Sequence, residues 1–221
     1  MRWYYSVLSA VFILSGCAVE KETVFSYTHR GYSYYAEGKY DLALADFNKA
    51  IRINPKLPDV YWHRAQIYMQ QKKYDLALAD LNKAIDINPL PLYYLGRGTV
   101  YDKKKEYDSA VKEYIKALRL DNNYAAAYNS LAWLLATCSD EKYRNGLKAL
   151  EFAKKAVELN PEGSRFDTLA AAYAETGDFD MAVKTQEKAI KLLNEKDKTD
   201  SLDEYEKHLE SYKRDTPWKD I

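Results

Sequence analysis

The three histidines are the first residues whose chemistry must be weighed, because imidazoles can bind a metal ion or transfer protons. His29 and His63 lie 34 residues apart, and His208 lies far along the chain. Two imidazoles on adjacent helices, about 8–10 Å apart, could share a metal ion only if their side chains converged. No nearby cysteine or paired carboxylate completes a ligand set. The sequence therefore predicts no metal site, and repetition of a structural unit explains the pair.

Other signs of catalysis or phosphate binding are missing from the sequence. The stretch Gly96–Gly98 lacks the lysine and the strand context of a phosphate-binding loop, and no serine has a nucleophile-elbow pattern. Lysine plus arginine equals aspartate plus glutamate, at 33 each, which is not the charge balance of a nucleic-acid-binding protein. We expect a protein that is not an enzyme, with no cofactor, small-molecule substrate or nucleic-acid partner.

The first 16 residues have the layout of a secretory signal. Arg2 precedes an apolar stretch from about Trp3 to Leu14, which is shorter than the roughly 20 residues of a membrane span. The string LSGC, ending at Cys17, resembles the lipobox of bacterial lipoproteins. The resemblance implies cleavage before Cys17 and a covalent lipid on its thiol, followed by a short tether over residues 17–23. Acyl chains add about 0.8 kcal/mol of membrane affinity per buried CH2. A plain secretory signal or an uncleaved anchor is the alternative.

The same resemblance bears on location and on the second cysteine. Ala18 stands where an aspartate typically retains such lipoproteins at the inner membrane. We therefore expect the outer membrane, facing the periplasm, or otherwise the outer face of the plasma membrane. With Cys17 acylated, Cys138 has no disulfide partner. We expect Cys138 to be a small apolar residue that closes a helix rather than a reactive thiol.

The chain repeats a helical pattern at a nearly fixed interval. YDLALADFNKAI (40–51) and YDLALADLNKAI (74–85) differ only at Phe47 and Leu81. Alanines recur at intervals of 34, 33, 39 and 33 residues in two series that are seven residues apart. Seven residues are two helical turns, so both series share one helix face, where a neighbouring helix can approach closely. The two series are Ala43, Ala77, Ala110, Ala149, Ala182 and Ala50, Ala84, Ala117, Ala156, Ala189.

With its opening aromatics Tyr27, Tyr61, Tyr94, Tyr128 and Phe166, this pattern resembles the tetratricopeptide repeat family. The resemblance implies an all-α fold, a right-handed α–α superhelix (solenoid) of about five helix–turn–helix units. We place these units at 24–57, 58–90, 91–124, 125–162 and 163–196, with a longer loop inside the fourth. Aspartates at positions 41, 75 and 108 are expected to be N-caps of the second helices.

Residues 197–221 are expected to form a capping helix and a tail, because Leu202, Tyr205, Leu209 and Tyr212 make one apolar stripe. A partner-binding helix is the alternative. The second half also resembles a recurring module of bacterial tetratricopeptide proteins, which implies a fold and no particular chemistry. This chain departs from the module where DTPWKD replaces a GKPYR-like end.

The family generally binds partners on the concave face lined by the first helices. By register this groove contains His29, Tyr32, Trp62, His63, Gln66, Gln70, Asn129 and Trp133, with Phe25 and Asp102 at further face positions. Aromatic anchors beside hydrogen-bonding side chains suit an extended peptide or a helix, although some of these aromatics could instead be core. We also expect structural ion pairs between units, such as Asp46 with Arg64; a basic ladder facing the ligand is the alternative.

The sequence therefore predicts a membrane-anchored lipoprotein that acts as a protein–protein interaction scaffold or adaptor in the bacterial cell envelope. A carbohydrate- or peptidoglycan-binding module, with Trp62 and Trp133 as stacking platforms, is an alternative. A subunit of a larger envelope assembly machine is another.

Overall fold

The computed structural model describes residues 23–193 and 198–220. The predicted signal segment, the lipidation site Cys17 and the tether up to residue 22 lie outside the described residues. Within them the chain is helical, without strands, and short turns join most consecutive helices. The helices are α1 (Val24–Ala36), α2 (Tyr40–Ile53), α3 (Pro58–Gln70), α4 (Tyr74–Ile87), α5 (Pro91–Lys103), α6 (Tyr107–Leu120), α7 (Ala125–Thr137), α8 (Gly146–Leu159), α9 (Gly163–Glu175), α10 (Phe179–Lys191) and α11 (Lys198–Tyr212), with a 3-10 turn η1 (Glu141–Tyr143) before α8.

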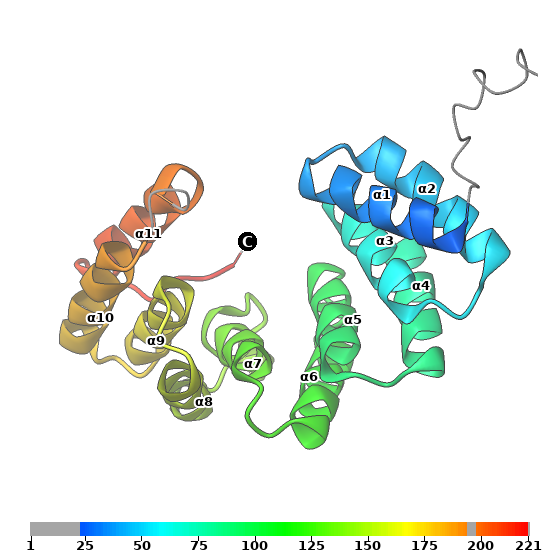
Figure 1. The fold of residues 1–221 in the computed structure, drawn as a ribbon. Helices are drawn as coiled ribbons and strands as arrows, with labels where there is room; N and C mark the ends of the chain where they lie inside the picture. The colour runs from blue at the N-terminus through cyan, green and yellow to red at the C-terminus, as the bar shows by residue number, and fades with distance from the viewer. Residues whose placement is uncertain (1–22, 194–197, 221) are drawn as a thin grey trace, which may run out of the picture.

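Consecutive helices pair into hairpins that stack side by side along an open arc (Figure 1). Each first helix contacts the first helix of the next hairpin, from α1 to α3 and onward to α9. In the second half, α5, α7 and α9 lie on the inner side of the arc, and α6, α8 and α10 lie on its outer side. The all-helical solenoid expected from the repeats is therefore confirmed.

Paired substitutions maintain the packing inside each hairpin. Gly31 of α1 faces Phe47 of α2, and a Cβ atom added at Gly31 would lie 2.6 Å from Cε1 of Phe47. The equivalent positions in the next hairpin hold Ala65 and Leu81, both fully buried. The smaller leucine leaves room for the alanine methyl group, so the one difference between the two repeated strings is matched on the facing helix.

The short turns inside the first, second, third and fifth hairpins each contain a left-handed residue. Gly38 and Gly177 have φ of 72° and 83°, and Lys72 and Lys105 adopt 57° and 60° at the equivalent places. After each of these turns, the second helix begins at an aromatic residue.

The N-cap prediction for the aspartates was wrong. Lys39 is the N-cap of α2 and makes no side-chain capping bond, while Asp41 is the second residue of the helix. Asp75 and Asp108 likewise lie in the first turns of α4 and α6. A carboxylate there still stabilises the helix through the positive end of its dipole, which explains the aspartate without a capping bond.

The fourth hairpin contains the predicted longer loop, between Thr137 and Gly146, with η1 at its centre. Cys138 caps α7 and is buried, at 3% exposure. Burial raises the pKa of its thiol, which disfavours the reactive thiolate. Arg144 fastens the loop by donating to the Cys138 carbonyl oxygen at 3.0 Å and pairing with Glu175 at 3.1 Å.

Helix α11 covers the last hairpin by packing on α10 and α9. Tyr205 and Tyr212 of the predicted stripe are buried, and Leu202 and Leu209 are half-buried. His208 is also buried, at 1% exposure. This packing is that of a cap rather than of a helix held free for a partner. No helix in the described part of the chain is both long and apolar enough to cross a membrane.

Candidate functional site

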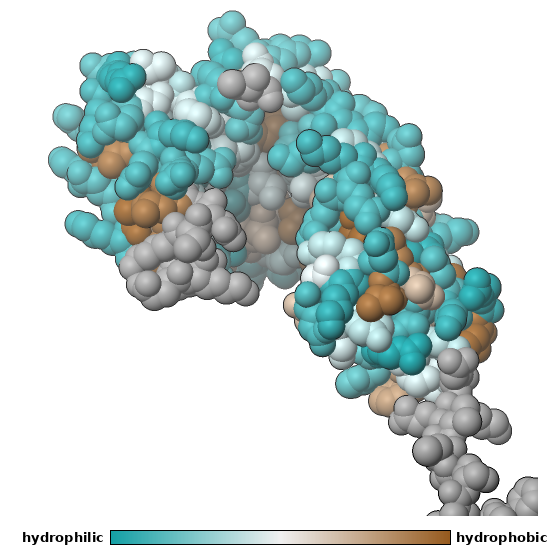
Figure 2. All heavy atoms as spheres, turned by 90° about the horizontal axis from the view of Figure 1, so that it is seen from above, coloured by the Kyte–Doolittle hydropathy of each residue, from teal (hydrophilic) through white to brown (hydrophobic). Residues whose placement is uncertain are grey.

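The concave side of the arc is hollowed between its two arms, as Figure 2 shows from above. In the arm formed by α1–α4, predicted groove residues form an aromatic cluster around His63. The His63 ring lies 4.6 Å from the ring of Tyr32, 5.3 Å from that of Tyr35 and 4.7 Å from that of Trp62, measured between centroids. We call these four residues the His63 cluster. The neighbouring first helices α1 and α3 bring them together; Tyr32, Trp62 and His63 are predicted groove residues, whereas the sequence did not single out Tyr35.

Burial sets the protonation states in the His63 cluster. It lowers the pKa of His63 and raises the pKa of Tyr32 to about 12, so both side chains are neutral at pH 7. Nδ1 of His63 lies 2.7 Å from the carbonyl oxygen of Asp59. A carbonyl oxygen only accepts, so Nδ1 carries the proton. The cluster is therefore an uncharged aromatic surface.

Trp62 adds an unused hydrogen-bond donor to this surface. Its indole Nε1 is buried and has no hydrogen-bond partner among the described residues. Gln66 and Gly96 lie beside it, since a Cβ added at Gly96 would be 3.8 Å from both Trp62 Nε1 and Gln66 Nε2. A buried donor without a partner costs about 1–3 kcal/mol. Because this atom is enclosed, a partner's acceptor would recover that cost by displacing a neighbouring side chain.

The other predicted residues of this arm lie further out. His29 is exposed beside Phe25, with ring centroids 5.4 Å apart, and Phe25 is 73% exposed. Gln70 is exposed at the end of α3. His29 and His63 are not joined in a metal-binding group, because the described residues contain no cluster of three or more His, Cys, Asp or Glu side chains that could hold a metal ion.

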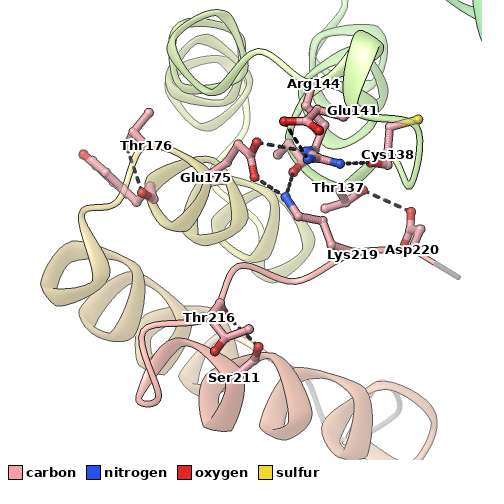
Figure 3. Close-up of polar contacts among 12 residues, drawn as sticks. Thr137, Cys138, Glu141, Arg144, Glu175, Thr176, Ser211, Thr216, Lys219 and Asp220 are labelled. Atoms are coloured by element: carbon pink, nitrogen blue, oxygen red, sulfur yellow. Dashed lines mark hydrogen bonds and ion pairs between the residues drawn. The ribbon is translucent and has the colours of Figure 1, made fainter.

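Asn129 and Trp133, the predicted groove residues of the fourth hairpin, belong to a second part of the concave face. Both line a pocket of about 290 Å³ that also includes Asp102 and Asp220. Trp133 is not open, because its indole Nε1 donates to Oδ2 of Asp220 at 2.7 Å. Asp220 belongs to the segment after α11, which turns back into the concave space (Figures 1 and 3).

Asp102 of α5 faces the same segment. A pocket of about 200 Å³ is lined by Asp102, Thr137 and Asp220, among others. Burial raises the pKa of Asp102 to about 6; Lys103 opposes this rise and Asp220 adds to it. Sequence reasoning placed Asp102 on the groove face but did not anticipate the contact with Asp220.

The arginine pairing differs from the sequence prediction. Arg64 pairs with Asp80 of its own hairpin at 2.6 Å, whereas Asp46 pairs with Arg30. The predicted Asp46–Arg64 pair was wrong because the antiparallel hairpin brings residues 16 positions apart face to face. The contact of Arg64 with the preceding hairpin goes to Oδ1 of Asn48. These guanidiniums are engaged within the scaffold, as is Arg97 with Glu113, rather than free for a ligand.

A buried polar network joins α11 to the last hairpin. Oδ1 of Asp167 accepts from Nδ1 of His208 at 2.8 Å and from Nε2 of Gln186 at 2.7 Å. The Gln186 amide also donates to the Tyr205 carbonyl oxygen at 3.1 Å. This network fixes the cap, and the sequence pattern held no signal for it beyond the helical spacing of Tyr205 and His208.

Comparisons with known proteins agree with this geometry. A family profile described as TPR repeat matches residues 31–72 and 98–136. Two profiles described as tetratricopeptide repeat match residues 58–89 and 167–196. A search of curated protein sequences found no matching relative.

Solved structures share the fold at low identity. A thermophilic TPR protein of Thermus thermophilus aligns with a TM-score of 0.67 and 21% identity, over 87% of this chain and 100% of that one. YrrB, described as a TPR protein with an unusual peptide-binding site, gives 0.57 and 21%, over 85% and 94%. A chain of the APC/C hetero-tetramer Cut9–Hcn1 gives 0.71 and 16%, over 88% and 38%.

The fold and the hollow together define a solenoid of helical hairpins with an open concave face. Since the matched repeats include parts of all five hairpins and together cover more than half of the chain, the chain is a tetratricopeptide-repeat protein.

Proposed function

We propose that this protein is a protein-interaction scaffold that binds a partner segment on its concave face, at the His63 cluster. The observation that carries the proposal is the buried indole Nε1 of Trp62, which lacks a partner beside a neutral aromatic surface. Aromatic anchors with directed hydrogen-bond groups are the residues that dominate binding energy in protein interfaces. An extended peptide or a helix would supply a carbonyl oxygen to Trp62 and apolar side chains to the rings.

We further propose that a lipid on Cys17 tethers the scaffold in the bacterial cell envelope, at the outer membrane facing the periplasm. The LSGC string at the end of the apolar segment supports this placement. Metabolic labelling with an alkyne palmitate analogue tests it: the label should enter the wild-type chain and be lost in Cys17→Ala. Label that persists in Cys17→Ala would contradict the lipid anchor.

Co-purification tests the scaffold function directly. A stoichiometric protein should co-purify with the chain from detergent-solubilised envelopes and be lost with Trp62→Ala. Leu42→Ala is the matched control, because Leu42 is a 50% exposed apolar residue of α2. The control should retain the partner. Equal recovery with both variants would contradict the assignment of the His63 cluster.

A second function class rests on the same residue. An exposed indole face can stack on a sugar ring, and Trp62 is half-buried. Binding of the purified chain to protein-free cell-wall sacculi, lost with Trp62→Ala, would favour a peptidoglycan-binding module over a scaffold.

A further inference from the structure

The segment at residues 213–220 reverses direction after α11 and enters the concave space (Figure 1). Asp215 has φ of 53°, and the Thr216 N–H donates to the Ser211 carbonyl oxygen at 3.1 Å. The Ser211 hydroxyl donates in turn to the Thr216 carbonyl oxygen at 2.8 Å. Pro217 then fixes the backbone before the three residues that make the long-range contacts.

Three successive side chains of this segment are bound by three different helices. The Trp218 ring lies 4.4 Å from the His208 ring of α11. Lys219 forms an ion pair with Glu175, the last residue of α9 (Figure 3). Asp220 is bound by α7.

Asp220 is held through both its side chain and its backbone. Its Oδ2 accepts from Trp133 Nε1 at 2.7 Å and from Thr137 Oγ1 at 3.1 Å. Its N–H donates to the Thr137 carbonyl oxygen at 2.9 Å. The Lys219 ammonium adds a longer contact, at 3.4 Å, to the Ala136 carbonyl oxygen. Backbone pairing together with alternate side-chain contacts is how an extended peptide is recognised by a protein surface.

The contact is shallow when compared with the core. Trp218 and Lys219 are only half-buried and Asp220 is exposed, whereas Tyr212 at the end of α11 is fully buried. Elements with few buried apolar contacts open at low free-energy cost. Asp102 also faces Asp220 across the 200 Å³ pocket, and the two carboxylates repel each other. The segment is therefore bound specifically but weakly.

We propose that the inner surface formed by Trp133, Thr137, Glu175 and His208 is a peptide-docking site, and that residues 218–220 occupy it in cis. The site takes in trans an extended partner segment of the same chemistry: an aromatic residue, then a cation, then a carboxylate. This inference rests on the proposed scaffold function and adds a second binding surface, with its own specificity, to the His63 cluster. A partner must displace the cis segment, which a short connection holds at a high effective concentration.

Fluorescence anisotropy with a labelled peptide tests the site. The probe is an amidated peptide with the sequence of residues 213–220, added to the full-length chain in detergent micelles. The variant Trp218→Ala/Lys219→Ala/Asp220→Ala removes the cis anchors. It should bind the probe roughly tenfold or more tightly than the wild-type chain. A control peptide with Lys219 and Asp220 exchanged keeps composition and charge and should bind roughly tenfold or more weakly than the probe.

Two outcomes would overturn the proposal. One is an anchor-free variant that does not bind the probe, and the other is a variant that binds the probe and the exchanged peptide equally. If circular dichroism shows that the triple variant is not folded, Lys219→Glu/Asp220→Lys replaces it, since that variant keeps Trp218 on His208. Adding Thr137→Val to either variant removes one hydrogen bond to the carboxylate and should weaken probe binding roughly tenfold or more. If the probe does not bind as expected but Trp62→Ala still releases the co-purified partner, the second docking site is rejected and the scaffold function stands.

Discussion

Replacing Gly31 with alanine should destabilise the protein unless Phe47 becomes leucine at the same time. The added methyl group would lie 2.6 Å from Cε1 and 2.7 Å from Cδ1 of Phe47, well inside van der Waals contact. Phe47 is fully buried, so the ring cannot move without disturbing its neighbours. The pair Ala65 and Leu81 shows that the same two positions accept alanine opposite leucine.

The magnitude follows from three opposing effects. Overpacking of a core costs roughly 1–3 kcal/mol. Alanine in place of glycine inside a helix returns about 1 kcal/mol. Phe47→Leu alone loses packing and costs roughly 1–2 kcal/mol. In the double variant the clash disappears and the helix gain remains, so the two changes should couple favourably by about 1–3 kcal/mol.

Urea unfolding followed by far-UV circular dichroism measures this coupling in the wild type, both single variants and the double variant. In heat denaturation, each kcal/mol should move the midpoint by about 2–4 °C. The reverse exchange in the next hairpin, Ala65→Gly with Leu81→Phe, is the matched control and should also couple favourably. Free energies that add within about 0.5 kcal/mol would refute the packing argument.

Three further perturbations test other parts of the structure. The folded-state pKa of Asp102 is about 6, above its ordinary 3.8. Between these pH values the folded chain therefore binds more protons at this carboxyl than the unfolded chain does. The free energy of unfolding should fall as pH rises through this window. Asp102→Asn should remove that fall and stabilise the chain at pH 7.5 by about 1–3 kcal/mol, but hardly at pH 4, by urea titration at both pH values. Lys105→Gly should raise the thermal midpoint by a few degrees, because glycine adopts the left-handed φ of this position without strain. Gly38→Ala should lower the midpoint, and each change should alter the free energy of unfolding by about 1 kcal/mol. Equal midpoints would contradict the strain argument. Asp80→Ala should cost about 3 kcal/mol and Asp46→Ala about 1, because the arginine paired with Asp80 is 16% exposed and the one paired with Asp46 is 46% exposed; a reversed order in urea denaturation would refute this.

The solenoid could be predicted because the residues that pack each hairpin recur at nearly fixed intervals in the sequence. The alanine series and the opening aromatics fix which helix faces meet, and Ala43, Ala77 and Ala110 are all fully buried. The N-cap prediction failed because the aspartates lie one residue inside the helix from the turn aromatics, where the helix dipole rather than a capping bond favours them. The ion-pair prediction failed because repeat spacing alone does not show whether Arg64 faces the second helix before it or after it.

The concave face was only partly predictable for a different reason. Tyr32 of α1 and Trp62 and His63 of α3 hold different positions within the repeat, but the repeat assigns each of them to the groove side of a first helix. Their meeting therefore follows from the stacking of adjacent hairpins. The contact of Trp133 with Asp220 joins residues 87 positions apart through an irregular segment. No periodicity encodes the path of such a segment, and only the departure of DTPWKD from the module's usual end marks it in the sequence.

Site-specific photo-crosslinking in living cells tests most directly whether the concave face is the binding surface. A photoreactive amino acid replaces Gln70, exposed on α3 at the predicted groove, or Ala79, exposed on α4 in the second-helix layer. The concave-face account predicts a discrete protein adduct from position 70 that is lost with Trp62→Ala, and none from position 79. An adduct from position 79 alone would contradict it.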